Sequence, residues 1–278
     1  MNFSLSTEQN EIYEIARKFA KNEMIPHAAK YDEESIFPEE QIKKAWELGF
    51  TNTCIPVEYG GNGLSLLDAV TIGEALAYGC MGMQTSIMCN DLALTPIVVG
   101  GTEEQKKRFL TPFTESPKIA SFCLTEPNNG SDAAGIRTSI KEDGDSWVLN
   151  GEKMWITNAG HADLFVAYCT TNPDLKHKGL CAVVVTSDME GIHIGKKEHK
   201  LGQNCSDTRA VRFENVRVPK ENMLGNPGEG WSIAMKTLDH SRPLVAAVAL
   251  GGSQRALDLS IEYALSLIHI SEPTRLGM

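Results

Sequence analysis

The sequence predicts an α+β protein with an N-terminal all-α domain, a middle antiparallel β-barrel or sandwich domain and the start of a C-terminal helical bundle. Apolar residues recur at helical spacing in the first third, the period becomes that of strands at Ile119, and helical spacing returns at Trp231. We therefore divide the 278 residues into an N-terminal helical domain (1–117), a middle β domain (118–226), the start of a C-terminal helical domain (227–265) and a tail (266–278).

Capping signals and apolar spacing place the helices of the first third. Capping boxes at Ser6–Gln9 and Thr102–Gln105 each open a helix. The loop Tyr59–Gly63 is rich in glycine but lacks the G-x-G-x-x-G spacing, so we interpret it as a connector and not as a phosphate-binding loop. Three further helices are expected at Pro38–Leu48, Leu66–Tyr78 and Gln84–Val99.

Short apolar runs bounded by turn residues predict the strands of the middle domain. The segment Glu142–Asp145 (Glu-Asp-Gly-Asp) indicates a hairpin between Thr138–Ile140 and Trp147–Leu149. The other expected strands are Ile119–Leu124, Leu164–Cys169, Gly179–Thr186 and Ala210–Phe213. A helix over Trp231–Leu265 follows, and its small residues from Val245 to Gly252 favour close packing against another helix.

Composition excludes several classes of function. The formal net charge of -10 disfavours a nucleic-acid partner, and no apolar run reaches the roughly 20 residues that span a bilayer. Met1–Gln9 lacks a basic region followed by an apolar run, so we expect no signal peptide. Seven cysteines without a C-x-x-C pair indicate reduced thiols in an intracellular protein, and we expect no metal.

The stretch Phe122–Asp132 is the first candidate site. A predicted strand ends there in Pro127 and Gly130, and hydroxyls flank the loop at Thr125 and Ser131. Because glycine lacks a Cβ, the backbone at Gly130 is open to a ligand. The alternative is an ordinary strand exit with a glycine turn.

The second candidate site is Gly151–Ala159. Trp155 offers a flat apolar face, and Thr157 lies two residues further along, on the same side of a regular strand. A Trp and a Thr in a strand are also typical of a core. Together with the Thr125–Ser131 loop, they favour a site for a planar heteroaromatic ring such as a flavin.

The pair of motifs T-E-P-x-x-G-S-D and K-M-W-I-T-N resembles the flavin-binding signature of the acyl-CoA dehydrogenases, with the medium-chain branch nearest. The resemblance covers about Met1 to Leu265 and implies that family's fold, here incomplete, with FAD between the domains. Further matching segments are Ala45–Gly49, Glu74–Gly79, Cys205–Arg209, Val216–Asn222, Arg242-Pro243 and Gln254–Asp258.

The resemblance also implies roles for individual residues. The FAD contacts that it implies are Phe122, Leu124, Thr125, Gly130, Ser131, Trp155, Ile156 and Thr157. The acyl-CoA contacts that it implies are Ser131, Asp239, His240, Ser241, Arg242, Gln84 and Thr85. Met88 stands where medium-chain relatives carry a Glu at the floor of the acyl tunnel, which leaves the chain length open. An alternative for Asp239 and Arg242 is a surface ion pair at i,i+3 spacing.

The implied reaction is oxidation of a short- or medium-chain acyl-CoA to the trans-2-enoyl-CoA. A carboxylate takes the α proton, the β hydride passes to FAD, and electrons continue to electron-transferring flavoprotein. The family further implies a homo-oligomer, a tetramer, in the bacterial cytoplasm or, for a mature eukaryotic chain, the mitochondrial matrix.

The sequence departs from the family after Leu265. Residues 266–278 do not match the expected segment, and Pro273 would stop a helix there. The catalytic Glu of most branches is not found, and Ser241 occupies the position where a minority carry the base. We therefore expect no catalytic residue and an inactive, truncated chain. The alternatives are a non-catalytic acyl-CoA- or FAD-binding fragment, a partner of full-length subunits, or an oxidase of related fold.

Overall fold

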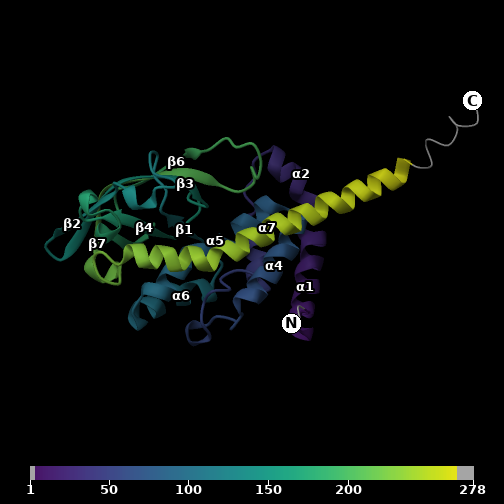
Figure 1. Cartoon of the computed structure of the whole chain (residues 1–278), viewed down its shortest axis with the longest axis horizontal. Coiled ribbons are helices and arrows are strands. Elements are labelled where there is room, and N and C mark those ends of the chain that lie inside the picture. Colours follow the sequence, from purple (N-terminus) through teal and green to yellow (C-terminus); the bar gives the residue numbers. More distant parts are fainter. Residues whose placement is uncertain (1–3, 268–278) are drawn as a thin grey trace, which may run out of the picture.

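The computed structural model describes residues 4–267. The order of helices, then strands, then a helix confirms the predicted α+β fold class. In Figure 1 the strands gather at one end of the molecule, the first helices of the chain lie at the other, and the long helix α7 (Gly230–Leu267) runs past both.

Capping boxes form at Ser6 and Thr102, as predicted, and a third forms at Ser65 with Asp68. The glycine-rich connector contains a single 3-10 turn, Val57–Tyr59, that ends at Gly60 with φ 89°. A π-helical turn, Ala20–Met24, joins the first two helices without a break. The helices of the first third are α1 (Thr7–Phe19), α2 (Ile25–Glu33), α3 (Glu39–Glu47), α4 (Leu66–Gly79), α5 (Met81–Gly100) and α6 (Glu103–Glu115).

The middle domain holds one eight-stranded sheet in the order β6-β7-β3-β2-β4-β5-β8, with β1 paired to β4. The hairpin of β2 and β3 confirms the prediction from Glu142–Asp145. The strands are β1 (Ala120–Cys123), β2 (Ser139–Asp143), β3 (Ser146–Thr157), β4 (Leu164–Thr170), β5 (Leu180–Thr186), β6 (Ile192–Lys197), β7 (Thr208–Pro219) and β8 (Met223–Leu224).

The sheet differs from the prediction in three respects. It is mixed and not purely antiparallel, because β1 pairs with β4 in parallel. Strand β7 is longer than the expected Ala210–Phe213, since its charged outer residues hide the alternation. Strands β6 and β8 were not predicted, because β6 carries polar residues and β8 is only two residues long.

Glycines let α7 approach its neighbours closely. A Cβ at Gly230 would lie 2.5 Å from the carbonyl carbon of Cys181 in β5, and a Cβ at Gly251 would lie 2.2 Å from the carbonyl oxygen of Glu74 in α4. The predicted close packing over Val245–Gly252 is thus present. The helix continues through Leu267, and the interpretation of Pro273 lies outside the described residues.

Candidate functional site

A cleft of about 570 Å³ lies where the ends of β1 and β3 meet α5 and α7. Every residue for which the resemblance implies an FAD contact lines this cleft: Phe122, Leu124, Thr125, Gly130, Ser131, Trp155, Ile156 and Thr157. The two motifs lie about thirty residues apart in the sequence, and the backbone joins them directly, because the amide of Met154 donates to the carbonyl of Thr125 over 2.9 Å.

Trp155 reaches the cleft through an irregularity that the sequence did not predict. The register of β3 on β7 shifts between Lys153 and Ile156, and Trp155 has the left-handed φ of 62°. Trp155 and Thr157 therefore do not follow the expected regular alternation. The indole is 54% exposed, so the interpretation as a core residue is wrong and a flat face is open to the cleft.

The loop after β1 is held from behind by the buried carboxylate of Glu126. This carboxylate accepts hydrogen bonds from Lys153 Nζ at 2.8 Å and from the amides of Arg137 at 2.7 Å and Thr138 at 2.9 Å. Burial would raise the pKa of Glu126, but the charge of Lys153 and the donated hydrogen bonds hold it below its usual value. Glu126 is therefore a fixed anion that shapes the loop.

The tip of this loop is closed by a pair of backbone hydrogen bonds between Glu126 and Asn129, each 3.1 Å long. Beyond it, a Cβ built at Gly130 would meet no atom within 4 Å. No neighbouring side chain therefore requires glycine at this position, and the backbone faces open space beside the cleft. This geometry permits a ligand to approach the chain at Gly130 and Ser131.

The residues before Pro243 divide between the cleft and a neighbouring groove. Arg242 lines the cleft and forms an ion pair with Asp239, and their side chains are 66% and 68% exposed. The alternative surface pair thus exists, at the rim of the cleft. Ser241 is buried and lines the groove, and its hydroxyl donates to the carbonyl of Leu238. His240 lines neither cavity.

The groove holds about 120 Å³ and joins the cleft through residues that line both, Cys89, Leu92 and Thr157. Gln84 and Thr85, predicted from the resemblance, line it together with Met88. Gln84 donates to the sulfur of Met88 at 3.3 Å, while its buried Oε1 has no partner. The rest of its wall is mainly apolar, with Leu244, Val245 and Val248 on the side of α7 beside the hydroxyls of Ser241 and Thr157.

Sequence reasoning missed several cleft residues that lie at helical spacing. Their signal was the continuation of one helix face: Cys89 and Leu92 extend the face of Thr85 and Met88 on α5. On α7 the equivalent face carries Trp231, Met235 and Leu238, followed by Arg242. Burial raises the pKa of Cys89 to about 12, so this thiol is a neutral, weakly polar part of the wall.

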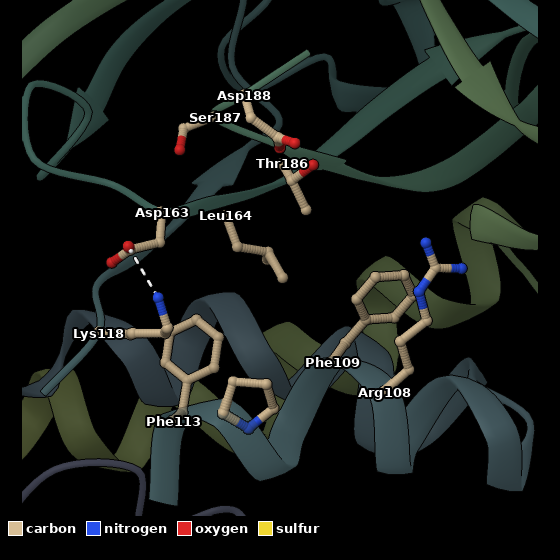
Figure 2. A pocket seen from close by; sticks show the side chains of 10 residues that line it. Arg108, Phe109, Phe113, Lys118, Asp163, Leu164, Thr186, Ser187 and Asp188 are labelled. Atoms are coloured by element: carbon tan, nitrogen blue, oxygen red, sulfur yellow. Dashed lines mark hydrogen bonds and ion pairs between the residues drawn. The ribbon is translucent and has the colours of Figure 1, made fainter. Parts of the chain in front are cut away.

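A second hollow, of about 320 Å³, lies between α6 and the ends of β4 and β5. Figure 2 shows Phe109 and Phe113 of α6 below it and Thr186 to Asp188 above it. Its one lysine, Lys118, is paired with Asp163 at 3.2 Å, and Asp163 also accepts the amide of Ile119. Arg108 pairs with Glu221 outside the hollow, and none of the predicted site residues lies here.

The chemistry of the cleft is that of a mostly apolar site with hydroxyls and one cation. No carboxylate is present among the described residues that line the cleft or the groove. Within residues 4–267 no cluster of His, Cys, Asp and Glu is arranged to hold a metal ion. The described helices include none that is long and apolar enough to cross a membrane.

Comparison with protein-family models finds three successive matches. They are the N-terminal domain of acyl-CoA dehydrogenases at residues 6–116, the middle domain at 121–216 and the C-terminal domain at 228–268. The third match extends slightly beyond the end that the resemblance indicated at Leu265.

Individual relatives agree with these models. The chain is 47% identical to a probable medium-chain specific acyl-CoA dehydrogenase of Caenorhabditis briggsae, over 95% of this chain and 66% of the relative. It is 44% identical to the short-chain specific enzyme of Sus scrofa, over 93% and 64%. Butyryl-CoA dehydrogenase from Megasphaera elsdenii superposes with a TM-score of 0.89 at 36% identity, over 95% and 70%. The chain thus spans about two thirds of the length of these relatives.

Proposed function

Because the chain belongs to the acyl-CoA dehydrogenase family, we propose that the cleft binds FAD and that the bound flavin oxidises a short- or medium-chain acyl-CoA to the trans-2-enoyl-CoA. The observation that supports this most strongly is the convergence of two motifs, at the ends of β1 and β3, on one cleft. Neither motif alone would define a site.

The residues of the cleft fit a flavin. Its volume of about 570 Å³ lies in the range of about 300–1,000 Å³ of small-molecule sites. The exposed face of Trp155 can stack on a planar ring, and the open backbone at Gly130 leaves room for its polar edge. When bound, FAD supplies the acceptor for the β hydride.

The chain itself supplies binding, orientation and exclusion of water. We propose that the hydroxyls of Thr125 and Thr157, which line the cleft, satisfy the ring's polar atoms, and that the exposed Ser131 and Arg242 contact the CoA portion. We assign the acyl chain to the groove of Gln84, Thr85 and Met88. An apolar Met88 as part of the wall favours a hydrocarbon chain over a polar one.

Proton abstraction needs a base that the described cleft does not contain. Glu126 accepts three hydrogen bonds and is buried behind the loop, so it is not available to a substrate. Ser241 carries only a neutral hydroxyl at the groove. This observation favours a second candidate function, a non-catalytic acyl-CoA- or FAD-binding chain or a partner of full-length subunits.

The partners that we propose are the acyl-CoA substrate, electron-transferring flavoprotein and further copies of an acyl-CoA dehydrogenase chain. Exposed apolar side chains on α7, among them Leu257, Ile261 and Leu265, support association with another subunit. The Caenorhabditis briggsae and Sus scrofa relatives are mitochondrial proteins, so we propose the mitochondrial matrix or, for a bacterial chain, the cytoplasm.

Titration of the purified chain with FAD, followed by quenching of flavin fluorescence, tests the proposal. We expect Trp155→Ala to weaken FAD binding roughly tenfold, because aromatic stacking contributes about 0.5–1.5 kcal/mol beyond buried area. Trp155→Phe should retain most of the affinity. Trp147→Phe is the matched control, since Trp147 lies in the same strand and does not line the cleft. Equal affinity of wild type and Trp155→Ala would contradict the proposed ring position.

A further inference from the structure

Two thiols meet away from the cleft, where the loop before β7 packs on the start of α5. The Sγ atoms of Cys80 and Cys205 lie 4.0 Å apart, although the residues are separated by 125 positions in the sequence. Cys80 is the N-cap residue of α5 and is partly exposed, whereas Cys205 is fully buried. A disulfide requires about 2.05 Å, so the sulfurs need to close by about 2 Å.

The surrounding backbone holds Cys205 in this position. A Cβ at Gly82 would lie 2.7 Å from the sulfur of Cys205, so only glycine allows the loop to pack this closely on α5. On the other side, the amide of Asn204 donates to Asp32 over 2.6 Å, and Gln203 has a left-handed φ of 53°. The two sulfurs are therefore neighbours because of the packing and not because of a flexible loop.

The surroundings shift the pKa values of the two thiols in opposite directions. The neighbouring Cys205 thiol lowers the pKa of Cys80 to about 7, and the amides of Met83 and Gly82 act in the same direction against the effect of burial. The pKa of Cys205 is raised by Cys80 and by burial. Cys80 is partly exposed at the N-terminus of α5, whereas Cys205 is fully buried, so we assign Cys80 as the thiol that peroxide reaches and Cys205 as the second thiol of the pair.

We propose that Cys80 and Cys205 form a peroxide-sensitive dithiol site. The Cys80 thiolate attacks one oxygen of hydrogen peroxide, which breaks the O–O bond, gives a sulfenic acid and releases hydroxide. The sulfur of Cys205 then attacks the sulfur of Cys80, and the sulfenic hydroxyl leaves as water with the Cys205 proton. Overall, the two thiols lose two electrons and two protons, and one peroxide becomes two waters.

The loop that carries Cys205 contacts residues beside both the groove and the cleft. Gln203 accepts a hydrogen bond from Thr85 of the groove over 3.0 Å. Two residues after Cys205, the carbonyl of Asp207 accepts the amide of Asn158, next to Thr157 of the cleft. A disulfide at Cys205 would fix this loop between the groove and the cleft. Any effect of the disulfide on ligand binding there rests on the proposed function, whereas the thiol chemistry does not.

Peptide mapping of the full chain tests the site without any variant. The reduced protein is treated with a small excess of hydrogen peroxide, digested without reductant and analysed by mass spectrometry. We expect one dominant cross-linked pair, the peptides of Cys80 and Cys205, which separates on reduction. Disulfides formed only between molecules, or the absence of this pair, would overturn the proposal.

Single substitutions test which of the two thiols peroxide oxidises. In Cys205→Ser we expect the sulfenic acid to persist at Cys80 and to be labelled by dimedone, whereas in Cys80→Ser we expect no dimedone label at Cys205. Cys54 in the same protein is the internal control, because it is also partly exposed but burial raises its pKa well above the usual range. Equal dimedone labelling of Cys54 and Cys80 in Cys205→Ser would show general oxidation and contradict a specific site.

Discussion

The backbone of Trp155 combines a left-handed conformation with a large side chain, a combination that usually has a reason. Left-handed φ in a non-glycine residue costs about 1–2 kcal/mol, and such conformations cluster at functional sites. Here the φ of 62° and the shift in register place the indole at the cleft instead of in the sheet. The sequence could not predict this, because a bulge depends on the partner strand β7 and not on the local pattern.

Comparison of two small residues at position 155 tests the strain. Because the indole is 54% exposed, either substitution removes little packing. We expect Trp155→Gly to be more stable than Trp155→Ala by about 1 kcal/mol, since only glycine adopts this φ without a steric cost. Urea unfolding of both variants measures the difference. Higher stability of the alanine variant would show that the backbone is not held in the left-handed region.

Asp91 is a buried carboxylate whose second oxygen has no partner. Its Oδ1 accepts from Thr53 Oγ1 at 2.9 Å and from the amide of Cys54 at 2.8 Å, and its Oδ2 has no hydrogen bond. Burial, opposed by these hydrogen bonds, raises the pKa of Asp91 above its usual value. The folded state thus favours the neutral form, and this contribution to stability is complete below the unfolded pKa and is lost as the pH rises through the folded pKa.

Asp91→Asn should therefore remove the free-energy cost of ionising this buried carboxyl, which grows as the pH rises. Asparagine keeps the Oδ1 acceptor and remains neutral, so we expect the variant to gain stability relative to wild type as the pH rises from about 4 towards 7. The free energy of unfolding across this range measures the effect. Asp145→Asn, at an exposed position, is the control. A constant difference between wild type and Asp91→Asn at all pH values would contradict the raised pKa.

At the scale of elements, the helices were predicted better than the strands. Helix periodicity and capping are local, so Ser6 and Thr102 identified the starts of α1 and α6. Strand pairing is not local, and the parallel pairing of β1 with β4 had no signal in either segment alone. The same reasoning applies to the site: the motifs at Thr125 and Trp155 were recognised, whereas their joining through the amide of Met154 required the fold.

The pair of Lys153 and Glu126 joins β3 to the loop after β1. Both side chains are buried, and Lys153 also donates to the carbonyl of Leu124 at 3.0 Å. We expect Lys153→Met to destabilise the fold by about 3–5 kcal/mol, because it leaves a buried carboxylate without its cation. Glu126→Gln with Lys153→Met should be less destabilised than Lys153→Met alone. Chemical denaturation of wild type, Lys153→Met and the double variant provides the comparison.

The lowered pKa of Glu126 adds a pH dependence to this pair. Its stabilising contribution is present above the unfolded pKa, about 4.3, and is lost as the pH falls through the folded pKa. Wild type should therefore lose more stability on acidification than the double variant. Equal loss of stability at low pH in wild type and the double variant would show that this pair does not determine the acid sensitivity of the fold.

Neighbouring glycines in α7 offer a matched test of its packing on α4. A Cβ at Gly251 would meet the backbone of α4, whereas a Cβ at Gly252 would meet the flexible end of Met81. We expect Gly251→Ala to cost about 1–3 kcal/mol through overpacking. Gly252→Ala should be neutral or stabilising by up to about 1 kcal/mol, because alanine favours helix. Thermal unfolding distinguishes the variants, and equal effects would contradict the close approach at Gly251.

At the scale of the whole molecule, the proposed flavin and acyl-CoA site has no carboxylate on its described walls. The protein loaded with FAD should therefore bind butyryl-CoA or octanoyl-CoA without steady-state reduction of a dye. The visible spectrum of the flavin reports binding in the same sample. Turnover comparable to a full-length relative would show that a base reaches the substrate by another route.

A carboxylate introduced at Ser241 is the sharpest test of that interpretation. Ser241 is buried at the wall of the groove, directly before Arg242 in α7, and the resemblance implies that a minority of the family carry the base at this position. We expect Ser241→Glu to gain dye reduction with acyl-CoA at least tenfold above wild type, because burial raises the pKa of a carboxyl towards that of a useful base. Ser241→Gln, which has the same shape without the charge, should remain at the wild-type level. Equal rates for the Glu and Gln variants, with FAD bound in both, would mean that position 241 does not face the α carbon.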